Sequence, residues 1–291
     1  MIALAIHGGA GTMTRRKMTS ALAARYEKGL AQALDAGHGV LAKGASALDA
    51  VCAAVVELED DALFNAGRGA CYNTDEKHEL DAAVMDGATR RAGAVGAVSG
   101  IRNPVLAARA VMEKSRHVLL IGRGAERFAR EQGVRMAPAT YFATRSRLLA
   151  LRRRAVGHHG TVGAVALDAD GRLAAATSTG GYTGKLPGRI GDSPLIGAGT
   201  YADELCAVSC TGLGEAFIRT AAAHDVSARM RYRRQKLSSA SAAALAAIAT
   251  LGADGGLIAV DRRGNIATPF NSEGMYRGAI DRRGRRSIAI Y

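Results

Sequence analysis

The chain has 291 residues, of which 48% are hydrophobic and 22% charged, values of a globular protein that exclude a disordered, collagen-like or coiled-coil chain. Its 36 glycines, 5 prolines and lack of tryptophan predict a core of small side chains on closely spaced elements. The net charge of +13 is spread over both halves, without stacking aromatics or a recognition motif, so we expect solvated basic faces and no nucleic-acid partner.

The N-terminal segment starts with a short apolar strand, followed by HGGAG at residues 7–11. We interpret HGGAG as a turn after that strand, because it lacks the spacing and the Lys-Ser/Thr ending of a phosphate loop. His7 is expected to be a hydrogen-bonded structural residue. No apolar run approaches the roughly 20 residues that cross a bilayer, and the N-terminal MIALAIHGGAG has neither the basic start nor the full hydrophobic region of a secretion signal. We therefore expect no membrane contact and a cytoplasmic location.

Apolar residues recur at helical spacing in several segments. The clearest segment is ASALDAVCAAVVELE, where Cys52 lies on the apolar stripe. The predicted helices span residues 19–36, 45–59, 104–114, 125–132, 214–224 and 239–250.

Short runs of small apolar residues between these helices pair around turn-forming sequences. We predict hairpins over residues 80–98, with a turn near Asp86-Gly87, over 161–177, with a turn at 168–171, and over 256–267, with a turn at 261–264. This pattern is typical of a hairpin-rich sheet flanked by helices and differs from an alternating βαβ chain.

Residues 140–160, TYFATRSRLLALRRRAVGHHG, form a basic stretch between the two halves. We predict a mobile linker here and assign His158 and His159 to it instead of to a catalytic or metal site. The cysteines lack metal-ligand spacing and are too sparse for a disulfide framework, so we expect reduced thiols and no zinc. The four cysteines are Cys52, Cys71, Cys206 and Cys210.

Three threonines have small neighbours: Thr161 in GTVG, Thr179 in STGG and Thr211 in CTGLG. A threonine hydroxyl needs a nearby base to act as a nucleophile, and the α-amino group of an N-terminal threonine supplies one that titrates near neutral pH. Such an arrangement requires a cut before the threonine. Gly160 suits a cut before Thr161, because it exposes its carbonyl and tolerates strain.

Seven motifs follow one another along nearly the whole chain: HGGAG (7–11), LFNAG (63–67), GTVGAVALD (160–168), TSTGG (177–181), LPGRIGDSPLIGAG (186–199), VSCTGLGE (208–215) and FNSEGMYR (270–277). Together they resemble the plant-type L-asparaginase and isoaspartyl peptidase family of N-terminal nucleophile hydrolases. No single motif would suffice, but the ordered set is specific.

The resemblance implies an α+β fold, a four-layer αββα sandwich of two antiparallel-rich sheets flanked by helices. It also implies a precursor that cleaves itself between Gly160 and Thr161. Residues 1–160 would become an α subunit ending in the basic linker, and residues 161–291 a β subunit, folded together as one domain. Family members pair as (αβ)₂, so we expect this self-association.

By resemblance, Thr161 is the nucleophile and its freed amine the base, attacking a side-chain amide to form a covalent acyl-enzyme. Thr179 resembles the second threonine that hydrogen-bonds to the nucleophile. Thr211 and the N–H of Gly212 correspond to the family's oxyanion donors.

A β-aspartyl substrate carries an α-carboxylate and an α-ammonium group, which require a cation and a carboxylate held in register. Arg189 and Asp192 match the family's pair, and the carbonyl of Gly214 would add a contact to the ammonium. Tyr182 is larger than the residue expected beside TSTGG and is predicted to narrow the pocket or to gate it.

The segment LEDDALFNAG resembles the family's sodium loop, in which oxygen ligands of low charge suit a hard monovalent cation. We expect a structural Na⁺ and no organic cofactor. Asn65 would position this loop near the nucleophile. The candidate ligands, mostly through backbone carbonyls, are Leu58, Glu59, Asp61, Phe64, Asn65, Ala66 and Arg68.

The predicted function is hydrolysis of β-aspartyl amide bonds in isoaspartyl dipeptides and L-asparagine. Two alternatives stay open. A glycosylasparaginase uses the same nucleophile chemistry and the same anchors. A catalytically inactive basic scaffold that binds polyanions would instead leave the chain uncut.

Overall fold

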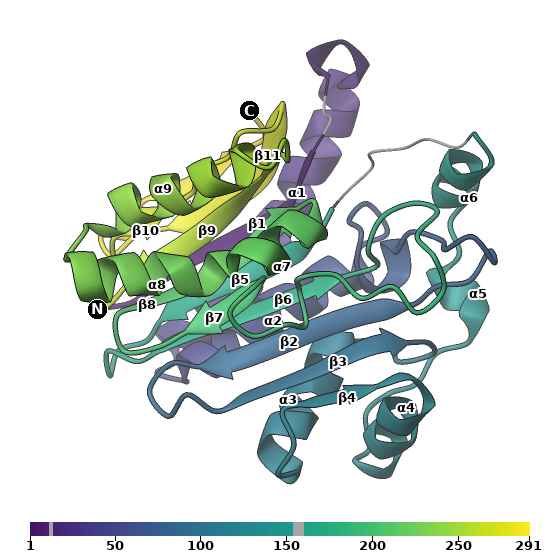
Figure 1. Ribbon diagram of the computed structural model, residues 1–291, viewed down its shortest axis with the longest axis horizontal. Helices are drawn as coiled ribbons and strands as arrows, with labels where there is room; N and C mark the ends of the chain where they lie inside the picture. The colour runs from purple at the N-terminus through teal and green to yellow at the C-terminus, as the bar shows by residue number, and fades with distance from the viewer. Residues whose placement is uncertain (12–13, 154–159) are drawn as a thin grey trace.

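The computed structural model describes residues 1–11, 14–153 and 160–291, which form two β-sheets packed face to face between layers of helices (Figure 1). Within these residues the larger sheet has eight strands in the order β12-β11-β1-β5-β6-β2-β3-β4, and the smaller has four in the order β10-β9-β8-β7. The pairing is antiparallel except between β3 and β4. The strands are β1 (Ala3–Gly11), β2 (Leu80–Asp86), β3 (Ala92–Val98), β4 (Leu119–Ile121), β5 (Val162–Leu167), β6 (Leu173–Thr179), β7 (Thr200–Ala202), β8 (Cys206–Gly212), β9 (Gly255–Asp261), β10 (Ile266–Ala267), β11 (Gly274–Ile280) and β12 (Arg286–Ala289).

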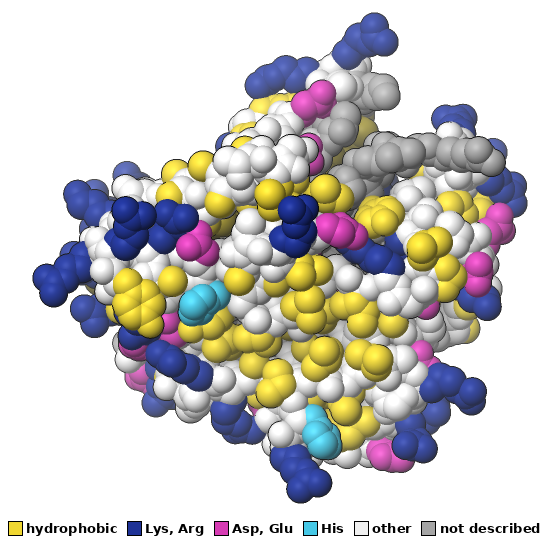
Figure 2. Space-filling model, viewed as in Figure 1, with side chains coloured by type: hydrophobic (Ala, Val, Ile, Leu, Met, Phe, Trp, Pro, Cys, Tyr) yellow, Lys and Arg dark blue, Asp and Glu magenta, His cyan; other side chains and the backbone are white. Residues whose placement is uncertain are grey.

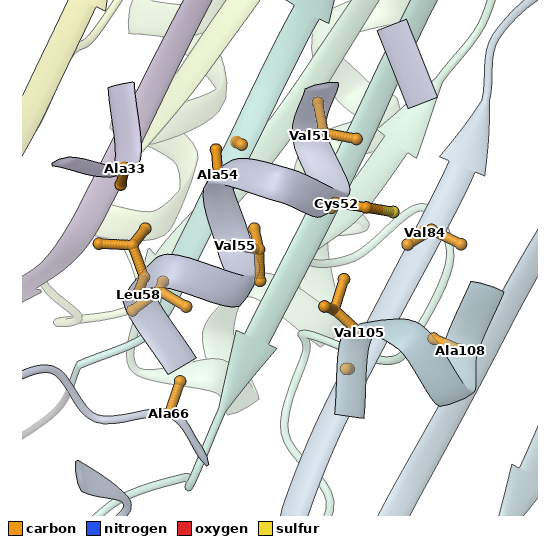
Figure 3. Packing of buried hydrophobic residues seen from close by; sticks show 14 of the residues in the cluster. Ala33, Val51, Cys52, Ala54, Val55, Leu58, Ala66, Val84, Val105 and Ala108 are labelled. Carbon is orange, nitrogen blue, oxygen red and sulfur yellow. The ribbon is translucent and has the colours of Figure 1, made fainter. Parts of the chain in front are cut away.

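Three clusters of buried hydrophobic side chains separate the layers. The first fills the space between the eight-stranded sheet and helices α1 (Ser20–Ala42), α2 (Ala47–Asp60) and α3 (Pro104–Lys114), and Figure 3 shows it around α2. The second lies between the four-stranded sheet and the C-terminal helices, and the third between the two sheets. Helix, sheet, sheet and helix therefore follow in order, which confirms the predicted αββα sandwich.

The core is rich in alanine, as the composition predicts. Ala33, Ala54 and Ala108 are fully buried in the first cluster, and Ala5 and Ala175 lie between the sheets. Small side chains let helices and sheets approach closely, so space for a larger residue is scarce.

Local signals explain where the helices begin. Thr19 caps α1 by accepting a hydrogen bond from Leu22 N. Ser46 and Asp49 form a reciprocal capping box at α2, which satisfies two otherwise unpaired N–H groups. Pro104 occupies the first turn of α3, where its missing N–H costs nothing.

The predicted helices are confirmed, with shifted ends, except for 214–224. That segment divides into α7 (Gly214–Thr220) and α8 (Ala222–Arg233), because Ala221 between them adopts the left-handed conformation with φ of 48°. The remaining helices are α4 (Gly122–Glu131), α5 (Ala139–Phe142), α6 (Arg145–Arg152) and α9 (Leu237–Ala249). The three predicted hairpins are present as β2–β3, β5–β6 and β9–β10.

The interpretation of HGGAG as a turn is wrong. These residues form the second half of β1, which pairs with β11 throughout and changes register between His7 and Gly9. Glycine at position 9 has φ of 111°, so the strand bulges without leaving the sheet. The motif is therefore a distorted strand beside residues 160–161.

Part of the expected linker is helical, since residues 139–152 include α5 and α6. Residues 154–159, with His158 and His159, lie outside the described residues. The four cysteines are buried and form no disulfide. No helix of the described residues is long and apolar enough to cross a membrane.

Arginine side chains of α8 pair with neighbouring carboxylates. Arg231 reaches Asp203 at 3.0 Å and Glu204 at 2.5 Å, and Arg229 reaches Asp225 at 2.7 Å. Figure 2 shows Lys and Arg side chains gathered at the end of the molecule where α8 ends and α9 begins. This basic end lies away from the start of β5.

Candidate active site

Thr161 and Thr179 meet because β5 and β6 are antiparallel neighbours. Val162 opposes Ser178 in the ladder, so the residue before β5 lies next to the last residue of β6. The hydroxyl of Thr161 lies 3.3 Å from that of Thr179, and both side chains are buried. The structure thus brings the two predicted threonines together.

The carbonyl of Gly160 receives two hydrogen bonds. The side-chain amide of Asn65 donates to it at 2.6 Å, and the hydroxyl of Thr179 donates at 3.0 Å. Both donors are almost fully buried, where electrostatic interactions are stronger than in water. Donors in this position stabilise negative charge that develops on the Gly160 oxygen.

Asn65 is itself held in place. Its amide also donates to Gly181 O at 2.5 Å, and its side-chain oxygen accepts from Cys71 N at 2.7 Å. The sequence predicted that Asn65 positions its loop near Thr161. The structure places its amide directly on the carbonyl before Thr161, a contact that the sequence did not predict.

The predicted oxyanion donors lie at the end of β8. Ala10 N donates to the hydroxyl oxygen of Thr211 at 3.1 Å, which leaves the threonine proton available for another acceptor. Gly212 has φ of 148°, and a Cβ there would lie 2.5 Å from Asp254 O. Only glycine fits this position.

Arg189 has a partner that the sequence analysis missed. Its Nε and Nη2 donate to the two carboxylate oxygens of Glu215, each at 3.0 Å. The ring of Tyr182 covers the same guanidinium, with its centroid 4.6 Å from Cζ. A carboxylate next to Gly214 was a visible signal, but spacing alone does not show which arginine it meets.

Asp192 carries an acceptor without a partner. The side chain is 3% exposed, and its Oδ2 atom is buried and makes no hydrogen bond within the described part of the chain. Burial raises the pKa of Asp192 to about 7. The charge of Arg189 opposes this shift but does not cancel it, and Oδ2 stays without a hydrogen-bond donor among the described residues.

Gly214 lies between the two predicted anchors. A Cβ at this position would lie 2.8 Å from Nη2 of Arg189 and 2.9 Å from Oδ1 of Asp192. The absence of a side chain therefore lets both charged groups reach the same space.

Asp81 supports the loop that bears the anchors, a role that its sequence context did not predict. Its Oδ2 accepts from Gly191 N at 3.3 Å, and its Oδ1 accepts from Ala97 N at 2.8 Å. Lys185 on the same loop is fully buried and donates to Glu79 O at 2.8 Å. Burial raises the pKa of Asp81 and lowers that of Lys185, while each charge opposes the shift of the other.

A cavity of about 10 Å³ remains among the side chains of the site, which is room for about one water molecule. Tyr182 is one of the residues that line it, and its predicted narrowing or gating of the pocket stays a prediction. The lining residues are Thr161, Thr179, Gly181, Tyr182, Arg189, Gly191, Asp192 and Gly212.

The predicted sodium loop offers backbone oxygens. The carbonyls of Glu59 and Phe64 face two loop glycines, since a Cβ on Gly67 would lie 2.4 Å from the first oxygen and one on Gly69 2.1 Å from the second. The side chain of Glu59 points elsewhere and accepts from Ser178 at 2.7 Å. Uncharged oxygens around a cradle without side chains fit a monovalent cation. The candidates Leu58 and Glu59 lie in the last turn of α2, and the turn after the helix carries Asp61, Phe64, Asn65, Ala66 and Arg68.

Arg147 of α6 also binds this loop. Its guanidinium donates to Gly69 O at 2.8 Å and to Leu63 O at 3.3 Å. The basic segment that precedes residue 154 is therefore anchored to the loop that carries Asn65.

Known proteins resemble this chain over most of its length. The family model described as asparaginase matches residues 1–157 and 152–290. The chain is 52% identical over 292 residues to a protein of Escherichia coli (strain K12) named isoaspartyl peptidase, covering 94% of this chain and 91% of that protein. It is 41% identical over 295 residues to the plant-type L-asparaginase of Pyrococcus abyssi, covering 94% and 95%. The isoaspartyl peptidase/L-asparaginase of Xenopus laevis is 39% identical over 287 residues, covering 95% and 91%.

Proposed function

The chain belongs to the asparaginase family, and we propose that it hydrolyses β-aspartyl amide bonds, in isoaspartyl dipeptides and in L-asparagine, after cutting itself between Gly160 and Thr161. One observation carries the proposal: the Gly160 carbonyl receives hydrogen bonds from Asn65 and Thr179 immediately before the Thr161 hydroxyl. A peptide bond held this way is ready for attack by the adjacent residue.

In the precursor, Thr161 Oγ1 bonds to the carbonyl carbon of Gly160, and the amide C–N bond breaks as the hydroxyl proton moves to the nitrogen. Asn65 and Thr179 stabilise the negative charge on the carbonyl oxygen during this step. Water then hydrolyses the ester, which leaves a Gly160 carboxylate and a Thr161 with a free hydroxyl and a free amine.

The hydroxyl proton of Thr179 can change its acceptor once the chain is cut. While Gly160 O accepts it, the Thr161 hydroxyl can only donate toward Thr179. Departure of the Gly160 carbonyl frees this proton to turn toward Thr161 Oγ1, where it stabilises the attacking oxygen.

In the mature protein the Thr161 amine takes the hydroxyl proton as Oγ1 bonds to the substrate's β-carbonyl carbon. Thr211 and Gly212 donate to the resulting oxyanion. The C–N bond breaks as the proton passes to the leaving amine, and water releases aspartate from the ester.

Substrate anchoring explains the unpartnered acceptor. The α-ammonium group would bind Asp192 Oδ2 and the carbonyl of Gly214, and the α-carboxylate would bind Arg189. Glu215 already occupies the guanidinium bidentately, so the substrate carboxylate must share or displace that pair.

We extend the proposal to a Na⁺ ion held by the carbonyls of Leu58, Glu59 and Phe64, with the other loop residues nearby. Its charge would fix the turn that carries Asn65. The cytoplasmic location and the (αβ)₂ assembly also remain predictions, and sedimentation equilibrium measures the latter.

Intact mass of purified wild type beside Thr161→Ala tests the proposal. We expect fragments of residues 1–160 and 161–291 from the wild type and one uncut chain from the variant. Wild-type protein should release aspartate from isoaspartyl dipeptides and asparagine. A single intact chain from both samples contradicts the proposal, and aspartate release from glycosylated asparagine alone would favour the glycosylasparaginase alternative.

A further inference from the structure

Behind the nucleophile lies a row of buried polar side chains that the proposed chemistry does not use. His7 Nδ1 lies 2.8 Å from Thr161 O, and its Nε2 lies 2.9 Å from Ser209 Oγ. Ser209 Oγ lies 2.8 Å from Thr177 Oγ1, which lies 2.6 Å from Thr200 Oγ1. All four side chains have no exposed surface. We call His7, Ser209, Thr177 and Thr200 the His7 network.

The acceptors at the His7 end set the direction of the protons from His7 to Thr177. A carbonyl accepts only, so Nδ1 of His7 donates to Thr161 O. Burial lowers the pKa of His7 to about 3, so the ring is neutral and Nε2 accepts from Ser209. Each hydroxyl has one proton, so Thr177 donates to Ser209, and the one proton of Thr200 is shared between Thr177 Oγ1 and Ser193 O. The network is an ordered series of donors that ends on the carbonyl of the nucleophile residue.

The far end reaches the substrate anchors. Thr200 Oγ1 also lies 2.9 Å from Ser193 O, and Ser193 directly follows Asp192. Gly199 N, next to Thr200, donates to Asp192 O at 3.1 Å. The network therefore spans the distance between the nucleophile and the carboxylate predicted to bind the ammonium.

Gly163 makes room for the network. A Cβ at this position would lie 2.0 Å from Ser209 Oγ and 2.5 Å from His7 Nε2. Since β5 pairs Gly163 with His7 and Thr177 on its two sides, any side chain there would displace the contact. The glycine in GTVGAV thus has a physical reason that the sequence alone did not show.

From this geometry we infer that the His7 network positions Thr161 relative to Asp192, with Ser209, Thr177 and Thr200 acting as positioning residues through His7. His7 does not serve as a base, because both ring nitrogens face other partners. Small displacements of a reacting group are costly, since about 1 Å can reduce a rate about 100-fold. The inference rests on the proposed function.

Paired substitutions at one position separate hydrogen bonding from packing. Thr177→Val keeps the shape but removes the hydroxyl, whereas Thr177→Ser keeps the hydroxyl and removes a methyl group. We expect kcat per cleaved chain on an isoaspartyl dipeptide to fall about 10-fold or more in Thr177→Val, with KM within about 2-fold, and Thr177→Ser to retain most of kcat. Equal kcat for both variants and wild type would overturn the inference, as would a larger loss in Thr177→Ser.

A second measurement needs no activity and no variant that must fold. Nitrogen-15 NMR of the wild-type histidine rings reports which nitrogen of His7 bears the proton. We expect the Nδ1–H tautomer, neutral from pH 5 to 8. An Nε2–H tautomer would reverse the donors and overturn the inference. Failure of wild type to release aspartate would instead contradict the proposed function, while the tautomer would still decide on the network.

Discussion

The two ends of the sandwich differ in the side chains that line their cavities, and the larger cavity is not the one that brings the predicted site residues together. At the start of β5, a space of about 10 Å³ is lined by Thr161, Asp192 and six other residues. At the opposite end, where α8 leads into α9, a cavity of about 620 Å³ is lined by exposed cations such as Arg262 and Arg263. The large cavity holds solvated charges, and the small one holds buried polar groups.

Catalysis depends on buried polar groups of the kind that line the small cavity. Buried groups exert strong fields on one another, and a buried acceptor with no hydrogen-bond donor among the described residues, such as Asp192 Oδ2, favours a ligand that donates to it. Exposed cations are screened by water and salt. Substitutions at the two ends should therefore differ in effect by orders of magnitude.

Removal of the Asn65 amide should have the greatest effect. In Asn65→Ala the Gly160 carbonyl loses its 2.6 Å donor, and fragments should form about 10²- to 10³-fold more slowly on a denaturing gel. Asn265→Ala at the basic end, where the amide contacts Asp261, is the matched control and should cleave at the wild-type rate. Wild-type cleavage in Asn65→Ala would show that this donor does not activate the carbonyl.

Asp192→Asn removes the charge that the substrate ammonium needs. We expect kcat/KM to fall about 30-fold or more, as for the loss of one partner of a buried charge pair. Because the carboxyl must be ionised and its pKa is about 7, wild-type kcat/KM should fall as pH drops below 7. The pH-rate profile of Asp192→Asn should lack that contribution. Asp261→Asn at the basic end is the control, and an equal loss there would refute the assignment.

Tyr182→Ala should have a moderate effect. Its ring lies over Arg189, and a contact of this kind contributes about 0.5–1 kcal/mol, so KM for asparagine should rise roughly 2- to 5-fold. Tyr232 is 78% exposed, and Tyr232→Ala should leave KM unchanged. An unchanged KM in Tyr182→Ala would mean that the ring does not order the guanidinium.

The double variant Arg262→Ala, Arg263→Ala should change least. We expect kcat/KM within about 2-fold of wild type and a free energy of unfolding within about 0.5 kcal/mol for each substitution, because both side chains are exposed. Retention on heparin at low salt should decrease. A large loss of aspartate release would show that the basic end participates in catalysis.

The parts that could be predicted from the sequence are those that depend on spacing along the chain. Helix periodicity and hairpin turns belong to this class. Thr161, Arg189 and Asp192 were identified through the resemblance of their motifs to a family, and the structure brings these three to one cavity. Contacts between distant segments were not predictable. Glu215 on Arg189 and His7 on Thr161 depend on how the sheets stack, which no local pattern specifies.

The strand order also determines how the two pieces of a cut chain would behave. Residues 1–160 supply β1 to β4, and residues 161–291 supply β5 to β12. Strand β1 is paired on both sides by strands of the later piece, and β6 of that piece is paired with β2. Strands of each fragment are thus hydrogen-bonded to strands of the other. The two fragments would stay associated after hydrolysis and would separate only when the sheet unfolds.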